Sequence, residues 1–416
     1  MKSDSNQPLR VFSLRVFASY AYWAGILCAF ATHSSATAQA RFKPAEDAVL
    51  LKTSVHAASA KSASFSSTER AWRSQPQDLQ AALAYARAVF MLGLTEGDLR
   101  WFGSAKAALK PWWEDSDLPA DGYFLRGLVK QGFHDFRGGL SDIDAAILRE
   151  RPRPEFWSWR FALNLLLSQM DAARADCKEV ELLFGPEESD PCHAILYYRT
   201  GQPEQALDLL GKTLRLARFK DGPSQDWLRF HLGEAYRTAG QPAQAIAAWE
   251  QHLKSRPESH LVRLALVELL NQQGQWQKAK TYAATDAPTD ALLMQSLLAS
   301  KGLQDGQTSA LAARFEARMN AQALRRESLI ERPRLIYLIR HGRDLPAGLA
   351  LSIDNWKLQN EPADAVLFAE AALALNQPRA AEPVVLWSEK TGYTDPQLKP
   401  LVQALKAHPA WIKAKQ

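Results

Sequence analysis

Few residues in this chain combine the types and spacing that catalysis or metal binding requires. Asp142 and Asp144 flank Ile143, so on a helix they point to different sides and make poor partners for acid–base chemistry. His193 follows Cys192 directly and points around the helix from it, which is unsuitable for a shared metal ion. The sequence also lacks the HExxH, GxSxG and GxGxxG patterns of common enzyme sites. We therefore predict no metal and no cofactor.

The strongest candidate for an active site is the tripeptide Arg340-His341-Gly342. It resembles the opening motif of the histidine phosphatases, in which Arg-His-Gly places a nucleophilic imidazole at the end of the first strand. Residues 343–416 are too few for the rest of such an α/β domain. At the end of a helix, the same residues would place cations on the C-terminal dipole and glycine in a left-handed cap. We predict no enzyme activity and keep a histidine-phosphatase-like enzyme as the alternative.

Turn residues recur along the chain at a period of roughly 34 residues, which is typical of stacked helix pairs. No unit of this size buries its apolar face alone, so neighbouring units must share a continuous core. The shortest step, 28 residues from Gly274 to Gly302, marks the unit of Gly302 as the least regular. The aligned turn residues are Gly93, His134, Ser168, Gly201, Gly240, Gly274, Gly302, Gly342 and Asn376.

The clearest copy of the repeat runs from residue 226 to residue 259. Its first helix, turn, second helix and terminator are marked by Leu232, Gly233, Tyr236, Gly240, Ala245, Trp249 and Pro257. This pattern resembles the tetratricopeptide repeat, which has two antiparallel helices per unit. The resemblance implies an all-α fold, a right-handed superhelical α-solenoid of about eight to nine helix pairs.

Small residues recur where the two helices of a unit must approach each other. Bulkier residues follow in the groove between helices, as Trp249 does, which predicts ridges-into-grooves packing with this indole in the core. The facing small pairs are Gly127 with Gly139, Ala194 with Ala206, Gly233 with Ala245, and Ala369 with Ala381.

The resemblance also implies a binding surface, because the first helices of such proteins line a concave face. Aromatic side chains flanked by both charge signs and an amide suit peptide recognition, which combines apolar pockets with orienting hydrogen bonds. A solvated helix face without a ligand is the alternative, since mixed charge on exposed helices is common. The ligand-facing positions carried onto this sequence are Tyr198, Arg199, Trp227, Phe230, Glu234, Arg237, Glu268, Asn271 and Arg340.

Cys177 and Cys192 fall on adjacent predicted helices, the second of one unit and the first of the next. In an oxidising compartment a disulfide between them would close a loop of ~15 residues and stabilise the fold by about 3 kcal/mol. Two buried thiols are the alternative, because cysteine at a core position needs no function.

The N-terminal segment reads as a targeting signal. Basic residues precede an apolar run over residues 16–32, and Ala38-Gln39-Ala40 offers a small-x-small cleavage pattern. We predict a signal peptide over residues 1–40, cleaved after Ala40, and export to a bacterial periplasm. A retained membrane anchor is the alternative, because the run nearly reaches the ~18–20 residues that a spanning helix needs.

The remaining chain divides by the presence or absence of the repeat. We expect a flexible leader and an N-terminal cap helix over residues 41–78, the solenoid over 79–395, and a capping helix and tail over 396–416. The formal net charge is +5, with 50 basic residues interspersed among 45 acidic ones. Without a basic stripe, nucleic acid is not a predicted partner.

These patterns predict a non-enzymatic scaffold or adaptor that binds a protein or peptide in the bacterial cell envelope. Membrane contact is expected only through an uncleaved signal segment. A glycan-binding protein and a structural spacer in an envelope complex are two competing interpretations. An exposed aromatic platform on the concave face would favour the glycan-binding protein, and a smooth polar face would favour the spacer.

Overall fold

The computed structural model describes residues 61–96, 100–216, 222–257, 259–283, 289–324, 332–342 and 344–412. The predicted signal peptide, its cleavage site at Ala40 and the first part of the leader lie outside these residues. Within them, all regular elements are helices, so the predicted all-α class is confirmed. No helix in this part of the chain is both long and apolar enough to cross a membrane.

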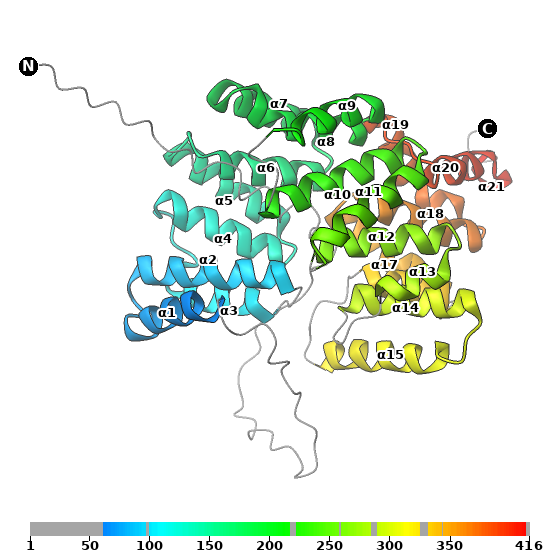
Figure 1. Cartoon of the computed structure of the whole chain (residues 1–416), viewed down its shortest axis with the longest axis horizontal. Coiled ribbons are helices and arrows are strands. Elements are labelled where there is room, and N and C mark those ends of the chain that lie inside the picture. Colours follow the sequence, from blue (N-terminus) through cyan, green and yellow to red (C-terminus); the bar gives the residue numbers. More distant parts are fainter. Residues whose placement is uncertain are drawn as a thin grey trace, which may run out of the picture.

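The first part of the chain stacks helix pairs in sequence order (Figure 1). Helix α1 begins at Lys61, within the segment that the sequence assigned to the leader, and Trp72 stacks on Tyr85 of the first pair with ring centroids 4.6 Å apart. The bounds are α1 (Lys61–Ser74), α2 (Leu79–Glu96), α3 (Arg100–Leu109), the short 3₁₀ turn η4 (Lys110–Trp112), α4 (Ala120–Gly132), α5 (Phe136–Arg149), α6 (Pro154–Leu166), α7 (Met170–Phe184), α8 (Pro186–Arg199) and α9 (Pro203–Thr213).

The second part continues the pairing and contains one irregular first helix, in which α16 passes directly into the π-helical turn η6. The bounds are α10 (Gly222–Thr238), α11 (Pro242–Ser255), α12 (His260–Gln272), α13 (Trp276–Ala283), α14 (Asp290–Leu303), α15 (Thr308–Leu324), α16 (Arg332–Ile336), η6 (Tyr337–His341), α17 (Leu345–Leu358), α18 (Pro362–Ala374), the 3₁₀ turn η7 (Pro378–Ala381), α19 (Glu382–Thr391), α20 (Leu398–Ala407) and α21 (Pro409–Ile412).

Backbone conformation explains most of the turn residues that the sequence singled out. After three of them, the sequence continues Gln-Pro, and proline at the first position starts the next helical element because its fixed φ suits a helix and its missing N–H costs no bond there. Left-handed φ values between 55° and 78° occur at His134, Ser168, Gly201, Gly240, Gly274 and Asn376.

Three predicted turn residues do not reverse the chain in this way. Gly93 lies inside α2 and Gly302 inside α14, where the left-handed residue is Gln304 with φ 53°. Gly342 has φ −70° and ψ −19°, so the left-handed cap predicted for it is wrong. The reason at residues 93 and 302 is close packing: a Cβ atom there would overlap the ring of Phe102 or Trp276, respectively.

Close approach of paired helices follows the small residues. A Cβ atom on Gly127 would lie 2.9 Å from the carbonyl oxygen of Gly139, so α4 and α5 require glycine at this contact. A Cβ atom on Gly233 would overlap the ring of Trp249, whose side chain is fully buried between α10 and α11. The prediction of Trp249 as a core residue is therefore confirmed.

Cys177 on α7 and Cys192 on α8 face each other with Cα atoms 5.6 Å apart, a separation typical of disulfides. Both side chains are buried in the cluster that joins these helices to α9 and α10. The structure thus brings the two cysteines together as a bonded pair, while the stabilisation of about 3 kcal/mol stays a prediction.

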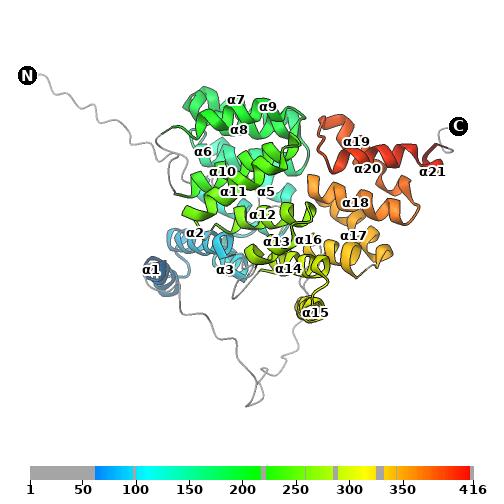
Figure 2. The same cartoon turned by 45° about the vertical axis from the view of Figure 1, so that its right-hand side comes forward.

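The solenoid curls so that its C-terminal helices return to the middle of the chain. In Figures 1 and 2, α19 lies beside α9 although the two helices are far apart in sequence. Nε1 of Trp387 donates a hydrogen bond to Oγ of Ser168 over 2.7 Å, and the backbone N–H of Asn360 donates to the carbonyl oxygen of Leu166 over 2.8 Å. This return encloses the inner face of the helix stack.

Candidate functional site

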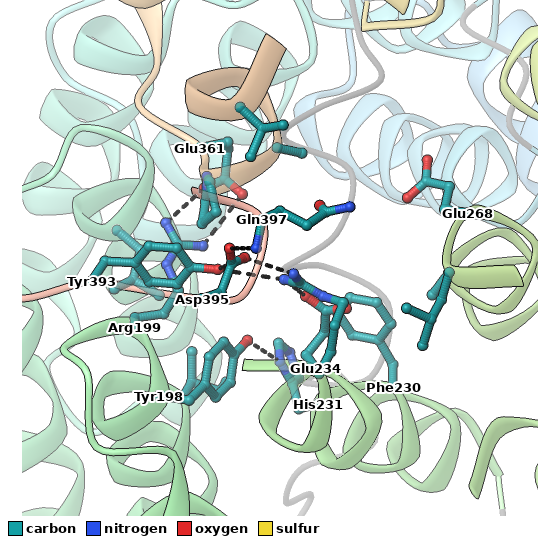
Figure 3. Close-up of a pocket in the computed structure, with 18 of the residues that line it drawn as sticks. Tyr198, Arg199, Phe230, His231, Glu234, Glu268, Glu361, Tyr393, Asp395 and Gln397 are labelled. Atoms are coloured by element: carbon teal, nitrogen blue, oxygen red, sulfur yellow. Dashed lines mark hydrogen bonds and ion pairs between the residues drawn. The ribbon is translucent and has the colours of Figure 1, made fainter. Parts of the chain in front are cut away.

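The first helices of successive units line a cavity on the inner face, in two adjoining chambers. The closed chamber has a volume of about 100 Å³ and lies among α6, α8, α10, α12, α18 and the loop over residues 393–397 (Figure 3). The open chamber has a volume of about 470 Å³ and lies among α12, α14, α16, η6 and α18. Residues that line both chambers are Glu268, Gln272, Arg332, Ala363, Val366 and Gln397.

Ion pairs to the returning C-terminal segment line the closed chamber, which is the more enclosed of the two. Arg199 on α8 donates to both carboxylate oxygens of Glu361, at 2.9 and 3.3 Å. Arg237 on α10 donates to Asp395 over 2.7 Å and also binds Glu234 one turn earlier on its own helix. Because every arginine here already has a carboxylate partner, these contacts hold the two parts of the solenoid together.

Asp395 is the centre of that junction. Its carboxylate accepts hydrogen bonds from the Tyr393 hydroxyl at 2.8 Å and from the backbone N–H groups of Gln397 and Leu398, so it also caps α20. Burial by itself would raise the pKa of Asp395, but Arg237 and the backbone hydrogen bond from Leu398 outweigh it, and the pKa is lowered. The carboxylate therefore stays charged at neutral pH.

Tyr198 and His231 form a second buried contact beside these pairs. The tyrosine hydroxyl and Nδ1 of the imidazole share a hydrogen bond of 2.7 Å. Burial, and after it the nearby Arg199, lowers the pKa of His231 to about 3. The imidazole is therefore neutral at physiological pH and cannot serve there as a cation for an anionic ligand.

The open chamber has paired cations at its edges and carboxamides around its space. Arg332 binds Asp364 at 2.8 and 3.2 Å, and Arg340 binds Glu370 at 2.9 and 2.8 Å. Lys301 donates to the carbonyl oxygen of Arg340 over 2.7 Å. The carboxamides that line this chamber belong to Asn271, Gln272, Gln295, Gln304 and Gln397.

Glu268 stands between the two chambers and is partly buried. In Figure 3 it lies apart from the ion-paired group around Asp395, on the far side of Gln397. Burial raises the pKa of Glu268 to about 7, although Arg332 opposes the shift. This carboxyl group is thus close to half-protonated at neutral pH and can donate as well as accept a hydrogen bond.

Most of the predicted ligand-facing residues line the two chambers. Tyr198, Arg199, Phe230, Glu234 and Arg237 face the closed one, Glu268 both, and Asn271 and Arg340 the open one. Trp227 lines neither chamber, because its position at the start of α10 faces the α8–α9 pair, where its side chain is 2 % exposed. A binding role for the set stays a prediction.

Several further lining residues were missed by the sequence. Gln272 follows Glu268 by one helical turn, so helical spacing was a sufficient signal for it. Glu361, Asp395 and Gln397 lie in the segment that returns across the solenoid, and the repeat period carries no signal for such a contact. Trp276 was missed because it starts a second helix, a position outside the ligand-facing pattern.

The structural context of Arg340-His341-Gly342 differs from that of a phosphatase. The tripeptide ends a π-helical turn, and the residues that the structure describes form no strand before it. Arg340 is bound to Glu370, and the His341 ring lies 5.1 Å from that of Tyr337. Burial, and then Lys301, lowers the pKa of His341, so the predicted cation at the helix end is Arg340 alone. Among the described residues no cluster of three or more His, Cys, Asp or Glu could hold a metal ion.

Comparison with known proteins identifies the repeat. Residues 191–258, which span α8 to α11, match the model of the tetratricopeptide repeat. No curated protein sequence matches the chain.

Solved structures with a similar arrangement of helices share little sequence with the chain. PilW, a widely conserved type IV pilus biogenesis factor, is 16% identical with a TM-score of 0.39, over 48% of this chain and 92% of PilW. Yeast Tom70 is 12% identical with a TM-score of 0.33, over 85% of this chain and 61% of Tom70. A tetratricopeptide repeat protein from Parabacteroides merdae is 15% identical with a TM-score of 0.26, over 78% of this chain and 98% of that protein. The chain therefore contains tetratricopeptide repeats at α8 to α11, within a stack of helix pairs that continues on both sides.

Proposed function

We propose that the chain is a non-enzymatic scaffold that binds a short segment of a partner protein in the open chamber. The observation that carries this proposal is the chamber itself, which combines about 470 Å³ of space with carboxamides and aliphatic side chains. Ligand sites are concave, of roughly 300–1,000 Å³, and are largely apolar with a few orienting polar groups. The tetratricopeptide fold supports a protein-interaction role in general.

The charged residues of the inner face support a scaffold over an enzyme. Arginines 199, 237, 332 and 340 are all bound to carboxylates of the same chain, so their charges hold the fold. The pKa values of His231 and His341 are lowered by burial, which leaves weakly basic imidazoles. A general base works best with a pKa near the working pH, and the pKa of His231, about 3, lies far below it, whereas that of Glu268 does not.

The cellular setting of the proposal rests on the N-terminal sequence. The apolar run over residues 16–32 and the Ala38-Gln39-Ala40 pattern favour export to the periplasm. The partner that we propose is therefore a protein of the bacterial cell envelope. The facing pair of Cys177 and Cys192 is compatible with that oxidising compartment.

Selection of random linear peptides against the purified chain tests this function. Trp227 and Arg237 are poor probes, since both are packed into the fold. Gln272 is exposed and lines both chambers, so Gln272→Ala should weaken a selected peptide by on the order of 1 kcal/mol without changing the melting temperature.

Lys212→Ala is the matched control. Lys212 lies on α9 away from both chambers, where it pairs with Asp208 on the surface at 2.5 Å. The Lys212→Ala variant should bind the selected peptide as the parent does. Failure to select any peptide, or equal affinity for the parent and Gln272→Ala, would remove the open chamber as the binding site.

A further inference from the structure

Trp276 lines the open chamber with its indole ring. Its side chain is 39% exposed, among the few large hydrophobic side chains that remain exposed in the described structure. The ring packs against Gly302 of α14, which lines the same chamber. A Cβ atom at residue 302 would overlap Cγ, Cδ2 and Cε2 of Trp276 at nearly equal distances. Residue 302 therefore lies over the ring and not at its edge. Glycine thus supports the ring as a platform.

The walls beside this platform are aliphatic. Leu298 of α14, Ile336 of α16 and the pair Val366 and Leu367 of α18 line the same chamber. A sugar ring stacked on the indole would turn some hydroxyl groups toward these walls, where they would lose hydrogen bonds to water without replacement. A planar apolar side chain has no hydrogen bonds to water to lose beside these walls, and it gains offset or edge-to-face contact with the indole.

Two of the three cations that line the chamber are already neutralised by carboxylates. Arg332 and Arg340 are each bound through two hydrogen bonds to Asp364 and Glu370. A charged ligand group would have to compete with these partners. The exposed carboxamides of Gln272 and Gln304 offer donors and acceptors that match a peptide main chain.

The size of the chamber limits the shape of the ligand. One turn of an α-helix with its side chains, ~10–12 Å wide with a pitch of 5.4 Å, occupies roughly 500 Å³. The open chamber, at about 470 Å³, has room for about one such turn, and the rest of a longer helix would lie outside it. The ion pairs of Arg199 and Arg237 line the adjoining chamber, which has about 100 Å³. An extended segment with one large side chain inside is the shape that fits.

We infer that the open chamber is an anchor subsite for one aromatic side chain of an extended peptide, which stacks on the indole of Trp276 while Gln272 and Gln304 bind its main chain. The inference rests on the proposed function and names the ligand class for it. It assigns specificity to Trp276 and Gly302 together, since the ring occupies its position only because residue 302 lacks a side chain.

The test uses heptapeptides displayed on phage, selected on the full chain and resynthesised with a fluorescent label. Selected sequences should share an aromatic residue at one position, and its replacement by leucine should weaken binding about tenfold. Trp276→Ala should cause a loss of similar size for the aromatic peptide and little change for the leucine peptide. Trp276→Phe should restore binding to within about threefold of the parent.

Gly302→Ala provides a second variant that keeps the indole and displaces it, and it should weaken the aromatic peptide in the same way. Gly103→Ala on α3 is its control, because a Cβ atom there meets no atom within 4 Å. Leu148→Ala, which removes an 87% exposed side chain from α5, is the control for Trp276→Ala. Thermal melts establish that each variant is folded.

The outcomes separate the inference from the proposed function. If no peptide is selected, the proposed function fails and the inference fails with it. If peptides bind without an aromatic preference, or bind Trp276→Ala as they bind the parent, only the inference is wrong. Tetra-N-acetylchitotetraose serves as a saccharide probe, and its binding to the parent but not to Trp276→Ala would assign the platform to glycans and overturn the inference.

Discussion

Two carboxyl groups on the inner face of the solenoid have pKa values that are shifted in opposite directions. Asp395 in the closed chamber is buried, yet Arg237 and backbone N–H donors hold its pKa below the ordinary value. Glu268, between the chambers, has its pKa raised to about 7 because burial outweighs the influence of Arg332. The first group is bonded on all sides and holds the fold together. The second borders open space, where a ligand can change its surroundings.

The inner face of the first helices thus has two roles in this chain. The positions predicted to face a ligand contact the returning C-terminal segment at α8 and α10, and border the larger chamber at α12 and η6. The closed chamber therefore depends on two particular carboxylates, Glu361 and Asp395, which pair with arginines of α8 and α10. Substitutions in each region test whether the two are separable.

The largest effect is expected at the closed chamber. Asp395→Ala removes one of the two carboxylate partners of Arg237, which then keeps only Glu234, and it removes the cap of α20. The loss of a charge-assisted hydrogen bond and of a helix cap together costs about 2–4 kcal/mol. Chemical denaturation should show a loss of that size, and Asp395→Asn should recover roughly 1 kcal/mol because an amide oxygen still caps the helix.

Asp354→Ala is the surface counterpart. Asp354 pairs with Lys357 on α17, and both side chains are more than half exposed, at 59% and 67%. Such pairs contribute roughly 0–1 kcal/mol. If Asp395→Ala costs no more than this control, the closed chamber is not held by its ion pairs and the comparison fails.

The sequence predicted the helix pairs and most turn residues because both depend on local patterns. His134, Ser168 and Asn376 were placed at turns by their phase alone, and each has a left-handed backbone. The return of the C-terminal helices was not predictable in this way. Arg199 and Glu361 are 162 residues apart, and nothing in a period of roughly 34 residues says which units meet again across the superhelix.

Local exceptions had a similar cause. Gly302 matched the turn pattern by residue type, but its backbone is helical because Trp276 packs against it. Glycine serves both at left-handed turns and at close contacts, and one sequence does not distinguish the two uses. The same contact supports the indole of Trp276 beside the open chamber. Trp276 and Gly302, which the repeat pattern did not assign correctly, therefore both belong to the least regular part of the repeat.

A smaller effect is expected from the pH dependence of Glu268. Its pKa in the folded chain, about 7, exceeds the ordinary 4.5, so the protonated form favours folding. That contribution is complete below about pH 4.5 and is lost as the pH rises through 7. Each pKa unit corresponds to ~1.4 kcal/mol, and since Glu268 is only partly buried we expect ~1–2 kcal/mol in total.

The measurement compares the free energy of unfolding of the parent and Glu268→Gln at pH 5 and pH 8. The parent should lose more stability than the variant over this interval, because glutamine does not titrate. Parallel changes in the two proteins would mean that Glu268 is solvated like a surface carboxyl group, and the contrast with Asp395 would then lose its basis.

The smallest effect is expected at His341, which follows Arg340 of the open chamber. Its lowered pKa leaves a neutral ring that contacts Tyr337 at a centroid separation of 5.1 Å, so His341→Ala should cost only about 0.5–1 kcal/mol. Hydrolysis of p-nitrophenyl phosphate should stay at background in parent and variant alike, because the guanidinium of Arg340 is engaged by Glu370 and no strand positions the imidazole in the described part of the chain. Turnover by the parent that disappears in His341→Ala would instead make the open chamber an active site. Peptide binding there would then be substrate binding, and the distinction between the chambers would be one between structure and catalysis.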